Sequence, residues 1–260
     1  MAGTNATTIA SGYLAYELTN SAFILGLVGM GFALPMLTLS LLGGALSDRM
    51  PRRRIIQVGQ GLISAGIAVV IIAIAFDVIG WVHLLIASVV QGVAFAFVVP
   101  ARQSLIVDIV GKEVVGNAVA LVSVSFSVTT LLSPAIAGLL YASIGPLGVY
   151  VTVFIFLFLA VICTTLVRYD DGLRSQSKER RSFLSEIGAG LRYARNDELV
   201  VALMVVALAF TVLAMPYRFL LPVLVVDVYE LGPRALGLLS SMMGLGAILG
   251  ASHVALSGNR

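Results

Sequence analysis

Charged residues are scarce in this chain. Only 11% of its 260 residues are Asp, Glu, Lys or Arg, whereas 59% are hydrophobic; soluble domains carry roughly a quarter charged residues. The mean hydropathy is +1.04. Such a chain lacks the polar surface that a water-soluble fold needs, so the composition predicts an integral membrane protein.

Groups that carry catalysis or bind metals are also few. The single cysteine, Cys163, lies in an apolar run, so neither a disulfide framework nor a cysteine metal cluster is available. The phosphate-binding pattern Gly-x-x-x-x-Gly-Lys-Ser/Thr is missing, which excludes ATP hydrolysis by that mechanism. No carboxylate, histidine and nucleophile gather at one depth. We therefore expect no enzyme, no cofactor and no metal.

Basic residues exceed acidic ones by 16 to 13, but they lie in short loops between apolar runs. This distribution indicates membrane topology and argues against nucleic-acid binding. If residues 47–54, 99–117, 168–198 and 257–260 are cytoplasmic, all basic residues except Arg218 and Arg234 lie inside. The bias predicts a multi-pass protein of the inner (plasma) membrane with both termini cytoplasmic.

Long apolar runs dominate what is present. About 20 apolar residues cross the hydrocarbon layer as a helix. Complete candidates for spans 2 to 8 are Phe23–Leu46, Ile55–Phe76, Ile79–Val99, Ala118–Leu140, Val149–Val167, Leu199–Val226 and Ala235–Leu256. Ala2–Tyr16 looks like the outer part of span 1. Strand-type alternation is absent, so we predict an all-α polytopic bundle.

The runs divide the chain into three parts. Residues 1–168 form an amino-terminal six-span bundle, residues 169–198 a cytoplasmic linker, and residues 199–260 the start of a second bundle. Residues 182–196 have the spacing of an amphipathic surface helix, although an ordinary linker fits equally well. We expect residues 199–260 to pack loosely. A thin repeat supports two bundles, because Gly26 precedes Asp48-Arg49 by the same interval as Gly237 precedes Asn259-Arg260.

The hairpin between spans 2 and 3 carries the most specific pattern. Gly44–Arg54 has the sequence GALSDRMPRRR. It resembles the loop signature of the major facilitator superfamily of transporters, Gly-x-Leu-Ser/Ala-Asp-Arg-x-x-Arg-Arg, with Pro51 in place of a glycine of the commonest pattern. The resemblance implies an inner gate in which Asp48 accepts hydrogen bonds from arginines. The gating residues would be Gly44, Asp48, Arg49, Arg52, Arg53 and Arg54. The alternative is an arginine cluster that only sets topology, capped by Asp48.

Further stretches resemble the enterobactin-exporter-like branch of this superfamily: Tyr16–Ser21, Pro100–Gln103, Asn117-Ala118 and Ser133–Gly138. Such proteins have two six-span bundles, so the resemblance implies a fragment with a clipped first span and no spans 9 to 12. It also implies secondary active export of small amphiphilic molecules, of siderophore or drug type, by alternating access. The alternative is a non-transporting membrane subunit or an inactive transporter fragment.

The implied partners are the lipid bilayer, a small-molecule substrate, and the missing carboxy-terminal spans or a partner chain. Spans 2 to 6 contain no embedded charge, so whether protons are the coupling ion stays open. Glu17, Asp227 and Glu230 are expected to be solvated at the outer ends. Tyr141 and Tyr150 are expected at the membrane interface.

Span 5 carries a stripe of small and hydroxyl-bearing residues. Ser133, Pro134 and Gly138 resemble the superfamily's antiporter signature, Gly-Pro-x-x-Gly-Gly, and are predicted to mediate close helix packing. Ser123, Ser127 and Thr130 continue the same face. These three are candidates for the substrate path, with helix packing as the alternative.

Two isolated polar residues are further substrate-path candidates. Gln91 would be a hydrogen-bonding group in a cavity or a helix contact; the superfamily often has an arginine three residues earlier, where this chain has Ser88. Arg218 is the one basic residue within a span, between Pro216 and Pro222. It would contact a substrate or counter-ion, or extend to the interface. The two prolines are predicted to break span 7.

Overall fold

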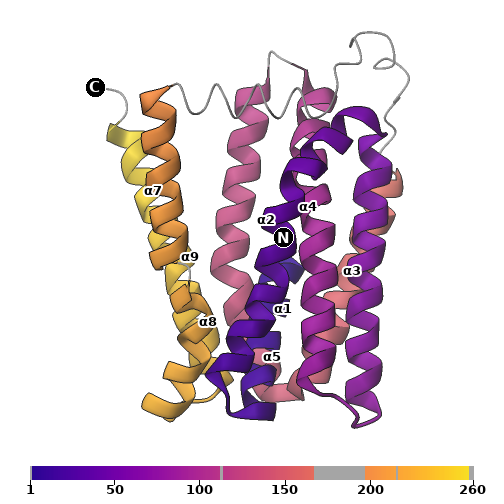
Figure 1. The fold of residues 1–260 in the computed structure, drawn as a ribbon, viewed down its shortest axis with the longest axis vertical. Helices are drawn as coiled ribbons and strands as arrows, with labels where there is room; N and C mark the ends of the chain where they lie inside the picture. The colour runs from indigo at the N-terminus through magenta and orange to yellow at the C-terminus, as the bar shows by residue number, and fades with distance from the viewer. Residues whose placement is uncertain (1, 112–113, 167–196, 215, 258–260) are drawn as a thin grey trace.

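The computed structural model describes residues 2–111, 114–166, 197–214 and 216–257. Within these ranges the side chains of residues 2, 48, 49, 198, 207, 208, 210–219 and 251–257 are outside the description. The elements in chain order are α1 (Ala2–Thr19), α2 (Ala22–Arg49), α3 (Arg52–Ala75), α4 (Trp81–Val110), α5 (Val115–Leu166), α7 (Glu198–Ala214), α8 (Pro216–Val223), the π-helix η2 (Leu224–Val228) and α9 (Pro233–Ser257) (Figure 1). No strand occurs in the described ranges, as predicted.

Five of these helices are long and apolar enough to cross a membrane: α2, α3, α4, α5 and α9. Their outer surfaces are covered by large apolar side chains, such as Phe23, whose exposed fraction is 78%. Apolar surface of this extent is unstable in water and stable in lipid. The chain is therefore a multi-pass helical membrane protein.

Helix α5 contains the two spans predicted as 5 and 6. Its 52 residues would extend about 78 Å as one straight helix, more than twice the hydrocarbon thickness. Gly145 interrupts it with φ 72°, a conformation that glycine adopts without a steric penalty. Pro146 follows, and proline suits the first position of a helix. Figure 1 shows the two parts as separate helices joined at the lower end.

Local signals also set the other helix ends. Asn20 has φ 46° after α1, and the Ser21 side chain accepts a hydrogen bond from the Ile24 amide at 3.4 Å to cap α2. Gly111, with φ 74°, ends α4. We call the end of the bundle that holds residues 47–54 the hairpin end, and the end that holds Asn20 and Gly145 the distal end.

Span 4 is longer than predicted. The run Ile79–Val99 was expected to end in a loop at 99–117, but α4 continues to Val110. Pro100 removes one backbone donor without ending the helix. Polar residues such as Arg102 and Asp108 lower the hydropathy of the last three turns but do not prevent helix formation. The length of the apolar run therefore underestimates the length of α4.

Span 7 changes geometry near the second of its two prolines. Its residues are described as α7 (Glu198–Ala214) and α8 (Pro216–Val223), and the π-helix η2 begins at Leu224, two residues after Pro222. Pro222 has no N–H to donate to the carbonyl four residues earlier, so the regular ladder is already interrupted where the wider turn begins. The predicted linker 169–181 and surface helix 182–196 lie outside the described residues.

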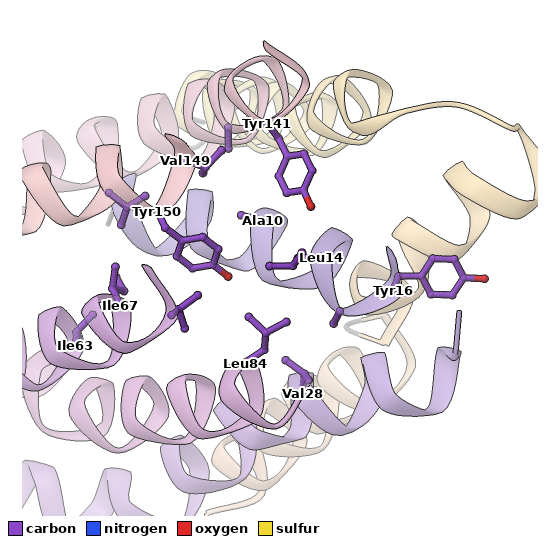
Figure 2. Packing of buried hydrophobic residues seen from close by; sticks show 14 of the residues in the cluster. Ala10, Leu14, Tyr16, Val28, Ile63, Ile67, Leu84, Tyr141, Val149 and Tyr150 are labelled. Atoms are coloured by element: carbon purple, nitrogen blue, oxygen red, sulfur yellow. The ribbon is translucent and has the colours of Figure 1, made fainter. Parts of the chain in front are cut away.

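The core lies around α1. Ala10, Leu14 and Ala15 are buried against side chains of α2, α3, α4 and α5 (Figure 2). Tyr141 and Tyr150 belong to this core, which corrects their expected interfacial position. Their hydroxyls reach partners inside the bundle, because Tyr150 shares a 2.7 Å hydrogen bond with Ser11 and Tyr141 donates to Glu17 at 2.7 Å. A tyrosine whose hydroxyl is satisfied has no need of the interface.

The left-handed backbone at Gly145 generates the first prediction. We expect Gly145→Ala to lower stability by about 1–2 kcal/mol, because a Cβ is strained at positive φ. Gly61→Ala is the matched control, since Gly61 lies within α3 with open space around its Cβ position. Thermal unfolding in detergent should show a lower midpoint for Gly145→Ala alone. Equal midpoints for the two variants would contradict the division of α5 at this residue.

Candidate functional site

The hairpin between α2 and α3 is anchored by a buried arginine. Arg52 is the first residue of α3, and the exposed fraction of its side chain is 5%. Its guanidinium donates to the carbonyl oxygens of Ser47 at 3.4 Å and Ser104 at 2.6 Å. It also forms an ion pair with the carboxylate of Asp108, near the end of α4. One side chain thus joins the hairpin ends of α2, α3 and α4.

Asp108 was missed by the sequence analysis, which placed it in a loop. A signal was present: Ala101, Leu105 and Asp108 recur at intervals of four and three residues, the spacing of one helix face. Ala101 and Leu105 are buried, and the exposed fraction of the Asp108 side chain is 18%. A partly buried carboxylate compensates the Arg52 charge where water is scarce.

The other hairpin residues lie in different environments. Arg53 donates to the carbonyl oxygen of Thr165 at the end of α5, while its Nε is buried and lacks an acceptor among the described residues. Arg54 is exposed, and Gly44 has open space around its Cβ position. The side chains of Asp48 and Arg49 lie outside the description, so the predicted bonds of Asp48 stay a prediction.

The packing motif of α5 lies against α9. A Cβ added at Gly138 would be 2.5 Å from the carbonyl oxygen of Pro233, and one added at Gly237 would be 2.5 Å from that of Pro134. One added at Gly244 would be 2.6 Å from the backbone of Leu131. Ser133 is buried beside this contact. These backbones approach closely because glycine has no side chain. Residues 233–244 therefore pack closely, which corrects the expected loose packing of this part.

This contact covers only one end of the two helices. On α5, residues 119–126 are all exposed, whereas Pro134, Ala137 and Gly138 are buried. On α9, Gly246 and Gly250 have nothing within 4 Å of their Cβ positions. Figure 1 shows α9 and the first part of α5 closer at the lower, distal end than at the upper, hairpin end. The amino-terminal half (α1–α5) and the carboxy-terminal part (α7–α9) thus meet distally and separate toward the hairpin.

The hydroxyl-bearing residues of α5 lie where the helix passes from its exposed part to its contact with α9. Ser123 is exposed, and Ser127 and Thr130 are half-buried. Ser123 and Thr130 donate to the carbonyl oxygens of Val119 and Phe126 of their own helix, each at 2.9 Å. Their oxygens keep free lone pairs, so they remain available as acceptors.

Of the two remaining substrate-path candidates, the structure describes the side chain of Gln91 alone. Gln91 is buried in α4 beside Gly92, where a Cβ would lie 2.3 Å from the carbonyl oxygen of Phe32 in α2. Among the described residues no hydrogen bond links Gln91 to α5. Arg218 belongs to α8, but its side chain lies outside the description.

Two carboxylates at the distal end were expected to be solvated. Both Glu17 and Asp227 are exposed, but each also accepts a hydrogen bond from a buried tyrosine. Tyr141 donates to Glu17, and Tyr16 of α1 donates to Asp227 of η2. Residues so distant in sequence give no local signal of pairing, so sequence reasoning could not find these bonds.

A helical membrane bundle with a one-sided contact between two parts is an arrangement typical of transporters. Residues 1–258 match the family described as transmembrane secretion effectors, which is of the major facilitator type. The chain belongs to this family.

Curated relatives cover most of the chain. It is 27% identical to the multidrug efflux pump Tap of Mycolicibacterium fortuitum, over 96% of this chain and 62% of the relative. It is 26% identical to macrolide efflux protein A of Streptococcus pyogenes, over 94% of this chain and 60% of the relative. It is 24% identical to the staphyloferrin A transporter of Staphylococcus aureus, over 88% of this chain and 57% of the relative. The chain thus spans about three fifths of the length of these relatives.

The buried ion pair generates the second prediction. Arg52→Ala should lower stability by about 3 kcal/mol, because it removes the buried guanidinium that pairs with Asp108 and donates to two carbonyl oxygens. Arg54→Ala removes the same charge from an exposed position two residues away and should change stability by less than about 0.5 kcal/mol. Thermal unfolding of both variants in detergent distinguishes them. Similar losses would mean that the hairpin arginines act only as a diffuse positive cluster.

Proposed function

We propose that this chain forms the substrate-translocating part of a secondary active exporter of small amphiphilic molecules, working by alternating access. One observation carries the proposal: the two parts touch at the distal end and are uncovered at the hairpin end. The distribution of basic residues favours a cytoplasmic hairpin end. In that orientation an exporter would receive its substrate from the cytoplasm, with the distal side closed.

The uncovered part of α5 supports an amphiphilic substrate. Leu121, Val122 and Phe126 are exposed there beside Ser123, and residues 114–144 contain no charged side chain. Apolar surface with a few hydroxyls suits neutral or weakly polar molecules of many shapes. The relatives are named for multidrug, macrolide and staphyloferrin A transport. Siderophore export of the enterobactin-exporter type is the narrower form of this proposal.

The proposed path and gate use separate groups. Ser123, Ser127 and Thr130 would line the path, with Gln91 and Arg218 as further contacts. The Arg52–Asp108 pair makes the hairpin ends of three helices one rigid unit. The arginine hairpin would then move as a body to close the inner side, with Asp48 as a proposed partner of the other part. Under the alternative, a non-transporting membrane subunit or inactive fragment, the same clamp would serve stability alone.

The third prediction tests transport at the interface of α5 and α9. Cells that express the chain should accumulate less radiolabelled macrolide than cells with an empty vector. Gly244→Ala should abolish most of that difference, because its Cβ would lie 2.6 Å from the backbone of Leu131. Gly246→Ala adds the same methyl group where nothing lies within 4 Å and should export normally.

Membrane quantities of the variants must match in this assay. If the parent chain left macrolide, ethidium and siderophore accumulation unchanged, the alternative of a non-transporting protein would replace the proposal.

The fourth prediction concerns orientation. In a Cys163→Ala background, Met50→Cys should resist a membrane-impermeant maleimide added to intact cells and react after permeabilisation. Met50 is exposed at the hairpin end, so burial would not explain its protection. Val228→Cys, exposed at the distal end, should react in intact cells. The reverse pattern would place the hairpin outside.

A further inference from the structure

Tyr16 and Asp227 form the hydrogen bond that joins the two parts of the protein at the distal end. Tyr16 is a buried residue near the end of α1, and its hydroxyl donates to the Asp227 carboxylate in η2. Figure 2 shows the Tyr16 ring leaving α1 on the side of the carboxy-terminal part. Among the described residues, no other hydrogen bond crosses between α1–α5 and α7–α9.

The surroundings hold the two groups in place. Gly12, one turn before Tyr16, lies beside Pro222 of α8. A Cβ added at Gly12 would be 3.5 Å from the proline ring. Val225 of η2 and Leu236 of α9 are completely buried. In the part of the chain that the structure describes, the closed distal end is therefore an apolar contact with one polar link at its edge.

The π-helix explains how Asp227 reaches Tyr16. In η2 the Tyr229 amide donates to the carbonyl oxygen of Leu224 at 3.1 Å, five residues back, and the Leu231 amide to that of Val225 at 2.9 Å, six residues back. A π-helical turn contains more residues than an α-helical turn. The residues that follow it are therefore rotated about the helix axis relative to a regular α-helix. Glu230, two residues after the end of η2, has φ 52°.

A second tyrosine–carboxylate pair at the same end serves as an internal comparison. Tyr141 of α5 donates to Glu17 of α1, so its bond lies wholly within the amino-terminal half. The chemistry is the same as in the Tyr16–Asp227 bond. The difference is that breaking the Tyr141–Glu17 bond releases nothing between the two parts.

We propose that the Tyr16–Asp227 bond is a distal latch, which holds the exporter in the state closed at the distal end until η2 withdraws Asp227. This inference rests on the proposed function, because a latch has a role only if the two parts move. The Asp227 carboxylate is exposed, so water replaces the tyrosine hydroxyl when the latch opens. The latch therefore biases the equilibrium between states without blocking it.

The test measures distal opening directly, without transport. Leu236→Cys in a Cys163→Ala background reports opening, because this side chain is inaccessible in the closed state. The purified chain in lipid nanodiscs is reacted with a water-soluble maleimide, with Val228→Cys as the exposed standard. Tyr16→Phe should raise the Leu236→Cys rate about tenfold, which corresponds to a change of about 1.4 kcal/mol in the equilibrium. Tyr141→Phe is the matched control and should leave the rate within about twofold.

A double-mutant cycle completes the test. Asp227→Ala should raise the rate as much as Tyr16→Phe, and the double variant should add little, because both remove one bond. Val225→Cys serves as a second reporter in case Leu236→Cys disturbs folding. Equal rates for Tyr16→Phe and Tyr141→Phe, or additive effects of the two latch variants, would overturn the latch. A parent Leu236→Cys as reactive as Val228→Cys would show that the distal end is not closed.

Discussion

Close approach of helix backbones at glycine is the constraint on which this structure depends. In lipid, apolar side chains gain little by exchanging one apolar neighbour for another, so helices associate where backbones come near. Gly43 and Gly92 place α2 against α4, where added Cβ atoms would lie 1.9 Å and 2.3 Å from backbone oxygens. Gly138 and Gly244 place α5 against α9 in the same way. Leucine and valine fill the remaining surface, but these contacts fix which helices are neighbours.

The polar links between described residues of different helices are few, and they lie near the ends of the bundle. At the hairpin end, Arg52 joins three helices through Asp108 and backbone carbonyls. At the distal end, Tyr141 fixes α1 to α5, and Tyr16 fixes α1 to η2. The Arg52 links named above lie within the amino-terminal half, and the Tyr16 bond at the distal end crosses to the carboxy-terminal part. The amino-terminal half is thereby stiffened, whereas among the described residues the contact between the two parts depends on shape and a single exposed bond.

Sequence reasoning succeeded where the signal is local. Hydropathy located the described spans, the predicted gap between Leu140 and Val149 contains the interruption at Gly145, and the regular helix of span 7 gives way to η2 just after Pro222. It failed where polar residues continue a helix, as at Asp108, and where partners are distant in sequence, as for Tyr16 and Asp227. The repeat that relates Gly26 to Gly237 is reflected in helix contacts only in part. Gly237 lies against α5, whereas its counterpart Gly26 has nothing within 4 Å of its Cβ position. A repeated residue type does not imply a repeated contact.

The small-residue face of α5 extends beyond its present contact. Gly138, Pro134 and Thr130 meet α9, and the same helical face continues through Ser127, Ser123, Ala120 and Gly116 toward the hairpin end. On α9, Gly237 and Gly244 are followed at helical spacing by Ala251 and Ala255. The sequence of each helix therefore continues its pattern of small residues beyond the present contact. Under the proposed alternating access, closing the hairpin end would bring these small-residue positions together in the way that Gly138, Gly237 and Gly244 already meet their neighbours at the distal end.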